Sequence, residues 1–74
     1  MKPAEFAFLL EKFKQEIKTL KGDDLLDKWI AFEGSEESKE PDLGVHKSLN
    51  LEATLVQEFG RGEWHNAVEI RRKK

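Results

Sequence analysis

The strongest constraint on the fold is an apolar stripe near the start of the chain. Its members recur at steps of four and three residues: Phe6, Leu10, Phe13, Ile17 and Leu20. This spacing places them on one face of a helix with 3.6 residues per turn. Pro3 suits the first turn of a helix, and Gly22 suits the position after its end. The sequence therefore predicts an amphipathic helix over residues 4–21, whose apolar face needs a partner.

A second helix is predicted over residues 24–33. Asp23 or Asp24 can cap its start, because a short carboxylate accepts the free N–H groups of the first helical turn. Its broad apolar face consists of Leu25, Leu26, Trp29, Ile30 and Phe32. Gly34 suits its end. Since only residues 21–23 join the two helices, we expect them to pack as a helical hairpin.

Residues 34–44 are rich in turn formers and have almost nothing to bury, so they are predicted to form a loop. This region is also acidic. Residues 23–42 carry eight acidic residues and two lysines, a net charge of −6, whereas residues 1–22 and 43–74 each carry +2. One interpretation is a hydrated acidic loop, and the other is a surface that docks on a basic partner.

The last third of the chain gives two conflicting signals. Residues 51–58 are good helix formers, which favours two short helices broken at Gly60. From Val45 onward, however, apolar residues alternate with polar ones, as in a half-buried strand. Three residues break that alternation: Lys47, Val56 and Gln57.

A hairpin turn at residues 60–63 would bring matched side chains together. It opposes Phe59 to Trp64 and Leu55 to Val68, and each such cross-strand pair contributes about 0.2–1 kcal/mol. Gly60 also supplies the positive φ that a hairpin turn needs. We therefore predict an antiparallel β-hairpin over about 45–72, packed on the helical hairpin. The expected fold is a single small α+β domain over residues 1–74, and a small all-α bundle is the alternative.

Catalytic and ligand-binding signatures are sparse. The chain has no cysteine, which removes disulfides, thiolate metal sites and cysteine nucleophiles, and favours an intracellular, cytoplasmic protein. We also find neither a signal peptide nor an apolar run long enough to span a membrane. His46 shares a predicted strand face with Ser48, but no acid is placed to complete a triad, and His65 is expected to pair with Glu58.

Metal and phosphate motifs are incomplete as well. The acidic residues of the loop lack the alternating order of a calcium loop. The sequence Gly60-Arg61-Gly62 lacks the rest of a phosphate-binding motif. We therefore predict that the protein is not an enzyme and that it has no catalytic, cofactor or metal site.

The remaining features favour a non-catalytic protein–protein interaction module, a small regulator or inhibitor of a larger protein machine. Phe8 lies opposite the apolar stripe of its helix, and a hairpin edge could pair with a second copy. The candidate partner-binding residues are Phe8, Glu33, Glu36, Glu37, Glu40, Asp42, Arg61, Arg71 and Arg72.

The alternative is a nucleic-acid-binding accessory protein. It would use Arg61 at the hairpin tip and the basic tail over residues 71–74 to contact phosphates. Four glutamates of the predicted hairpin oppose this reading, because they would repel the phosphates: Glu52, Glu58, Glu63 and Glu69.

Residues 20–29 resemble the opening of the amino-terminal helical region of mitotic checkpoint kinases, in which a glycine–acid–acid turn precedes a helix with a tryptophan. Residues 63–66, Glu-Trp-His-Asn, resemble a later turn of that region. The likeness is short. The present chain departs from it at Glu33-Gly34-Ser35, where that family continues with an aromatic helix. We base no prediction of fold or function on it.

Overall fold

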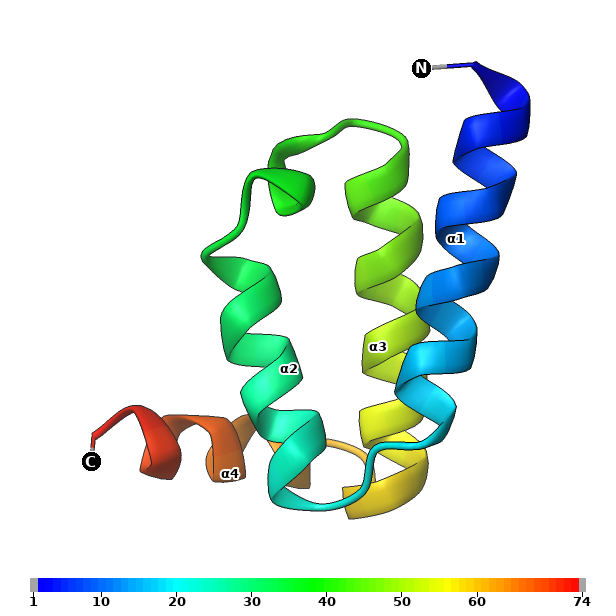
Figure 1. The fold of residues 1–74 in the computed structure, drawn as a ribbon. Coiled ribbons are helices and arrows are strands. Elements are labelled where there is room, and N and C mark those ends of the chain that lie inside the picture. Colours follow the sequence, from blue (N-terminus) through cyan, green and yellow to red (C-terminus); the bar gives the residue numbers. More distant parts are fainter. Residues whose placement is uncertain (1, 74) are drawn as a thin grey trace.

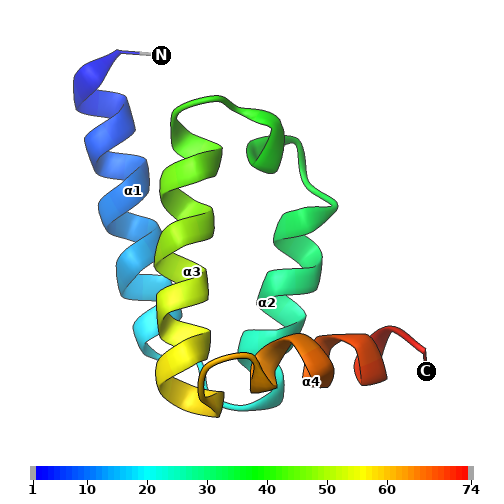
Figure 2. The same cartoon turned by 180° about the vertical axis from the view of Figure 1, so that it is seen from behind.

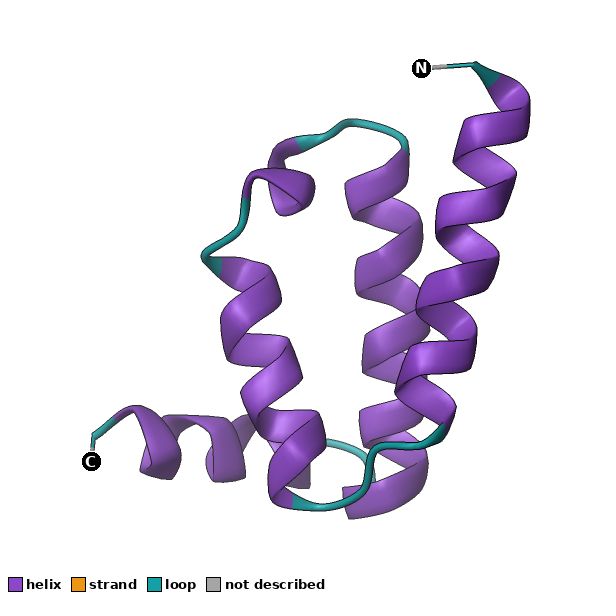
Figure 3. Ribbon diagram, viewed as in Figure 1, coloured by secondary structure: helices purple, strands orange, loops and turns teal. Residues whose placement is uncertain are grey.

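The computed structural model describes residues 2–73, and within this range all regular secondary structure is helical (Figure 1, Figure 3). The elements in chain order are α1 (Pro3–Lys18), α2 (Asp23–Glu33), the short 3-10 helix η1 (Glu36–Lys39), α3 (Leu43–Phe59) and α4 (Glu63–Arg72). α1, α2 and α3 run alternately down and up, and α4 runs across the end of α2 and α3 (Figure 1, Figure 2).

The expected α+β fold is therefore wrong, and the all-helical alternative is the observed one. α3 and α4 replace the β-hairpin expected over residues 45–72. The reason lies in the spacing of the buried residues of α3, of which Leu43, Lys47, Leu51 and Leu55 form a row at steps of four. Since four is an even number, a helical row also satisfies the alternation expected of a strand.

The other odd-numbered apolar residues of α3 belong to a different face of the helix. Val45 and Leu49 are 55% and 58% exposed, whereas Leu51 and Leu55 are fully buried. Because all four of these residues have odd numbers, the strand interpretation placed them on one face, whereas the helix places them on two.

Lys47, an exception to the strand pattern, is accounted for by the helix. Its side chain is only 6% exposed, and its Nζ forms an ion pair with the Glu37 carboxylate of η1. The same amine lies 5.1 Å from the centre of the Phe13 ring. The aliphatic stem of Lys47 thus fills the core, while its charge is matched by a carboxylate and an aromatic face.

The turn between α3 and α4 uses the glycines that suggested a hairpin. Gly60 has φ 100° and Gly62 has φ 87°, both in the region that favours glycine. The Gly60 N–H still donates a helical hydrogen bond to the Val56 carbonyl at 2.8 Å, and the positive φ of Gly60 then ends α3. The need for positive φ was correctly predicted, but the turn joins helices, so the hairpin edge expected to support self-association does not exist in residues 2–73.

The first two helices occupy nearly the residues that the sequence predicted, but the main neighbour of α1 is α3 rather than α2, so the expected helical hairpin is only partly observed (Figure 1). α1 ends at Lys18 rather than at residue 21, and the Thr19 hydroxyl donates to the Glu16 carbonyl at 2.9 Å. The loop expected over residues 34–44 is only partly irregular, because η1 and the first turn of α3 occupy much of it. The Ser35 hydroxyl donates to the Phe32 carbonyl at 2.7 Å, which tightens the connection from α2 to η1.

All four α-helices contribute to one apolar core. Its buried members are Phe13 and Ile17 from α1, Leu25, Leu26 and Phe32 from α2, Leu51 and Leu55 from α3, and Trp64 and Val68 from α4. Trp64 is the largest fully enclosed side chain, and its ring meets that of Trp29 edge to face with centroids 4.7 Å apart. None of the helices in the described range combines the length and apolarity needed to cross a membrane.

Candidate functional site

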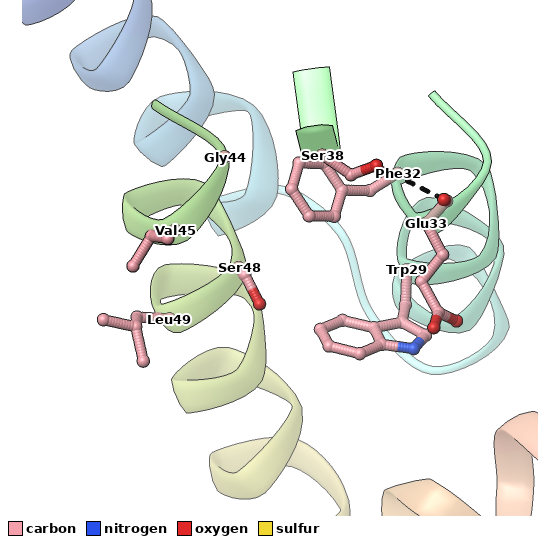
Figure 4. A pocket seen from close by; sticks show the side chains of 8 residues that line it. All are labelled: Trp29, Phe32, Glu33, Ser38, Gly44, Val45, Ser48 and Leu49. Atoms are coloured by element: carbon pink, nitrogen blue, oxygen red, sulfur yellow. Dashed lines mark hydrogen bonds between the residues drawn. The ribbon is translucent and has the colours of Figure 1, made fainter. Parts of the chain in front are cut away.

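A groove of about 400 Å³ opens between α2 and α3, a volume within the usual range of about 300–1,000 Å³ for ligand sites. Figure 4 shows the α2 residues on one wall, the α3 residues on the other, and Ser38 of η1 at one end. The residues that line this α2–α3 groove are Trp29, Phe32, Glu33, Ser38, Gly44, Val45, Ser48 and Leu49. None of these residues comes from α1, which lies on the other side of α3 from α2 (Figure 2).

The end of the groove is shaped by a close backbone contact. The Ser38 hydroxyl donates to the Glu33 carbonyl at 3.3 Å and to the Ser35 carbonyl at 2.7 Å. η1 then crosses the first turn of α3 at Gly44, where a Cβ would lie 2.6 Å from the Glu37 carbonyl oxygen. A glycine at this position therefore allows η1 to seal the end of the groove.

The α3 wall presents the most accessible apolar surface of the groove. Val45 and Leu49 are one helical turn apart and lie on the same face of α3. The α2 wall contributes the half-buried Trp29 and the buried Phe32. Figure 4 shows Ser48 pointing toward Trp29, whereas the exposed Val45 and Leu49 lie at the outer rim of the α3 wall. A partner that covers the groove together with this rim would bury apolar area.

Among the predicted acidic site residues, three are held in ion pairs within the chain. Glu33 pairs with Arg72, Glu36 with Lys39 and Glu37 with Lys47. Only Glu33 lines the groove.

Glu40 and Asp42 belong to a second hollow, of about 390 Å³, between the start of α1 and the start of α3. Phe6 and His46 also line this hollow, and their rings meet edge to face with centroids 5.4 Å apart. The predicted acidic residues therefore do not form one surface, because Glu33 lines the α2–α3 groove while Glu40 and Asp42 line the second hollow.

The basic candidates are also separated from one another. Arg61 is exposed in the turn between α3 and α4. Arg71 donates two hydrogen bonds to Asp27, from Nε to Oδ1 at 2.7 Å and from Nη2 to Oδ2 at 3.1 Å. Arg72 is shared between Glu33 and Glu69. Lys74, the last residue of the predicted basic tail, lies outside the described residues.

The contact between Arg71 and Asp27 shifts the pKa of both side chains. Hydrogen bonding to Arg71 lowers the pKa of Asp27, and the same hydrogen bond raises the pKa of Arg71. Because the folded pKa of Asp27 lies below its unfolded value, the contact stabilises α4 against α2 above that unfolded value. The stabilisation is lost as the pH falls through the folded pKa.

Phe8, the remaining candidate, is exposed on α1. It is not among the residues that line the α2–α3 groove. The structure therefore does not join Phe8 to the acidic candidates or to the basic ones in one surface.

Each of the two histidines packs against a different aromatic ring. His46 packs against Phe6, and the ring of His65 stacks on Trp64 with centroids 3.6 Å apart. Glu58 and His65, expected to pair across a hairpin, lie near the end of α3 and in the first turn of α4. Within residues 2–73, no group of three or more histidine, cysteine or acidic residues is placed to hold a metal ion.

Comparison with known proteins assigns no relative. No model of a known protein family matches the chain, and no curated protein or solved structure matches it either. The groove itself must therefore carry any functional argument.

Apart from Glu33, none of the residues that line this groove was predicted from the sequence to bind a partner, and the exposed Val45 and Leu49 are the most notable omissions. The helix-forming composition of residues 51–58 was the signal that could have found them, because a helical α3 separates Val45 and Leu49 from the buried row.

Proposed function

We propose that this protein is a non-catalytic interaction module that binds another protein through the α2–α3 groove. The observation that carries the proposal is the exposure of Val45 and Leu49 beside a groove lined by Trp29 and Phe32. A partner that covered the exposed parts of both aliphatic side chains would gain on the order of 2 kcal/mol from apolar burial. Neither side chain belongs to the apolar core of the domain.

The proposal describes a small regulator or inhibitor that acts by occupying the surface of a larger protein. A compact helical domain suits this role, because a preformed binding face loses little conformational entropy when it binds. We place the interaction in the cytoplasm, since the chain has no cysteine for the disulfides on which small secreted domains commonly depend.

Nucleic-acid binding has no comparable support in the structure. Arg71 and Arg72 are already matched by carboxylates on α2 and α4. The β-hairpin that was expected to present Arg61 is replaced by a turn between helices. We therefore do not develop this alternative further.

The Leu49→Lys variant tests the proposal in a pull-down from a nuclease-treated lysate of the source cells. We expect wild-type protein to retain a stoichiometric protein partner and the variant to lose it, because a lysine would introduce a charge into the apolar contact. Leu49 is exposed, so the variant should keep the wild-type circular dichroism spectrum.

Phe8→Lys is the matched control, because Phe8 is an exposed apolar residue on α1 that does not line the groove. It should retain the partner. Loss of the partner with Phe8→Lys but not with Leu49→Lys would move the binding surface to α1. Partners that disappear on nuclease treatment, or no retained protein at all, would contradict the proposal.

A further inference from the structure

We propose that the element bound in the α2–α3 groove is an amphipathic helix of another protein, with basic residues on its polar face. This inference rests on the proposed function and adds the chemistry of the partner. It follows from the shape of the groove, the charge around it, and the absence of a suitable element on a second copy.

The shape of the groove suits a helix. Its walls are two neighbouring antiparallel helices, and η1 lies at one end while α4 lies beyond the other (Figure 2, Figure 4). Val45 and Leu49 are four residues apart on α3, so they match apolar residues spaced by one turn on a partner helix. A helix seated there would make a fourth roughly aligned helix beside α1, α2 and α3.

Negative charge is concentrated on the elements that form the groove. From α2 to the end of α3, residues 23–59 contain ten acidic residues and three lysines, a net charge of −7. Each of these lysines already pairs with a glutamate: Lys28 with Glu16, Lys39 with Glu36 and Lys47 with Glu37. The three lysines are therefore engaged, and two arginines of α4 engage Asp23, Asp27 and Glu33, so the region keeps a smaller excess of negative charge.

One carboxylate lines the groove and a second lies beside its α3 wall. Glu33 lines the α2 wall. Its partner Arg72 also binds Glu69, so this group of three keeps a net charge of −1. On α3, Glu52 lies three residues after Leu49 and thus next to it on the helix surface. Glu52 has no ion pair within the described residues. These carboxylates would favour a partner whose apolar anchors are flanked by lysine or arginine.

A second copy of this chain lacks such an element. The apolar stripe of the lysine-rich α1 faces its own core, where Phe13 and Ile17 are buried. The arginines near the end of α4 are bonded to acidic residues. Two grooves placed face to face would bring like charges together, which opposes association. Charge complementarity therefore selects a different, basic protein.

The inference is tested with two synthetic amphipathic helices of about 18 residues that share the same leucine positions. The polar positions are lysine in one peptide and glutamate in the other. Titration calorimetry with the full-length protein should show that the lysine peptide binds about tenfold more tightly at low ionic strength, because several carboxylate contacts each contribute modestly. The difference should shrink as salt is added.

Three variants locate the binding. Leu49→Gln should weaken the lysine peptide strongly, because it removes an apolar contact without adding charge. Glu52→Gln should weaken it about threefold, as expected for one solvent-exposed ion pair. Glu5→Gln on α1 is the control and should leave the affinity unchanged.

The outcomes separate the two proposals. Equal binding of both peptides, or tighter binding of the glutamate peptide, with sensitivity to Leu49→Gln would overturn the basic partner and leave the groove as the binding site. No binding of either peptide, or binding insensitive to Leu49→Gln, would contradict both proposals. Self-association of the wild type in sedimentation, lost in Leu49→Gln, would show that a second copy fills the groove and would overturn the inference.

Discussion

The Trp64→Ala variant is expected to lose about 3–5 kcal/mol of unfolding free energy, the usual cost of removing a large aromatic side chain from a core. Trp64 is 2% exposed and lies in the first turn of α4. Its ring contacts Trp29 and His65, so truncation would remove the main apolar anchor of α4. A domain of this size is stabilised by only about 4–11 kcal/mol, so the variant should be close to unfolding.

Urea denaturation followed by far-ultraviolet circular dichroism measures this loss without relying on tryptophan fluorescence. Ile70→Ala is the matched control, because Ile70 lies on the same helix and is exposed. It should change the free energy of unfolding by no more than about 0.5 kcal/mol. A Trp64→Ala variant within about 1 kcal/mol of wild type would mean that α4 does not pack on the core as described.

The Gly44→Ala variant is expected to be destabilised by about 1–3 kcal/mol, the usual cost of overpacking. In most helix interiors this substitution is stabilising by roughly 0.5–1 kcal/mol, so the expected sign is reversed here. A Cβ at this position would lie 2.6 Å from the Glu37 carbonyl oxygen and 2.9 Å from that of Ser38. Both atoms belong to the backbone of η1, which would have to move away from α3.

Gly34→Ala provides the comparison for this effect. Its Cβ would meet nothing closer than the Ile30 carbonyl oxygen at 3.8 Å, an ordinary contact, and its φ of −89° suits alanine. The variant should therefore match or slightly exceed wild type in chemical denaturation. A Gly44→Ala protein as stable as Gly34→Ala would contradict the close packing of η1 on α3.

The sequence predicted the amino-terminal half of the fold well for a physical reason. The steps of four and three in the stripe of α1 fit a helix and do not fit a strand. In α3 the apolar spacing was ambiguous, because a row at steps of four also alternates. Lys47 was one of three residues that a strand left unexplained, with Val56 and Gln57. Only the structure shows the Glu37 partner of Lys47, which comes from η1.

The candidate site was harder to predict than the fold. The groove depends on how α2 and α3 sit relative to each other, and that arrangement is set by tertiary contacts. Val45 and Leu49 were assigned to the core face of a strand, which hid their exposure. Glu33, Arg71 and Arg72 were predicted to bind a partner, and the ion pairs by which they join α2 to α4 could not be read from the sequence.

The central claim is that α3 is a helix whose two apolar faces separate the core from the groove. Nuclear Overhauser contacts within residues 43–59 test it most directly, because a strand would place Val45, Leu49, Leu51 and Leu55 on one face. We expect helical contacts between residues three apart, with Leu51 and Leu55 contacting the core and Val45 and Leu49 making no contact with it. Cross-strand contacts between residues 53–59 and 64–70, with Leu49 in the core, would contradict the account.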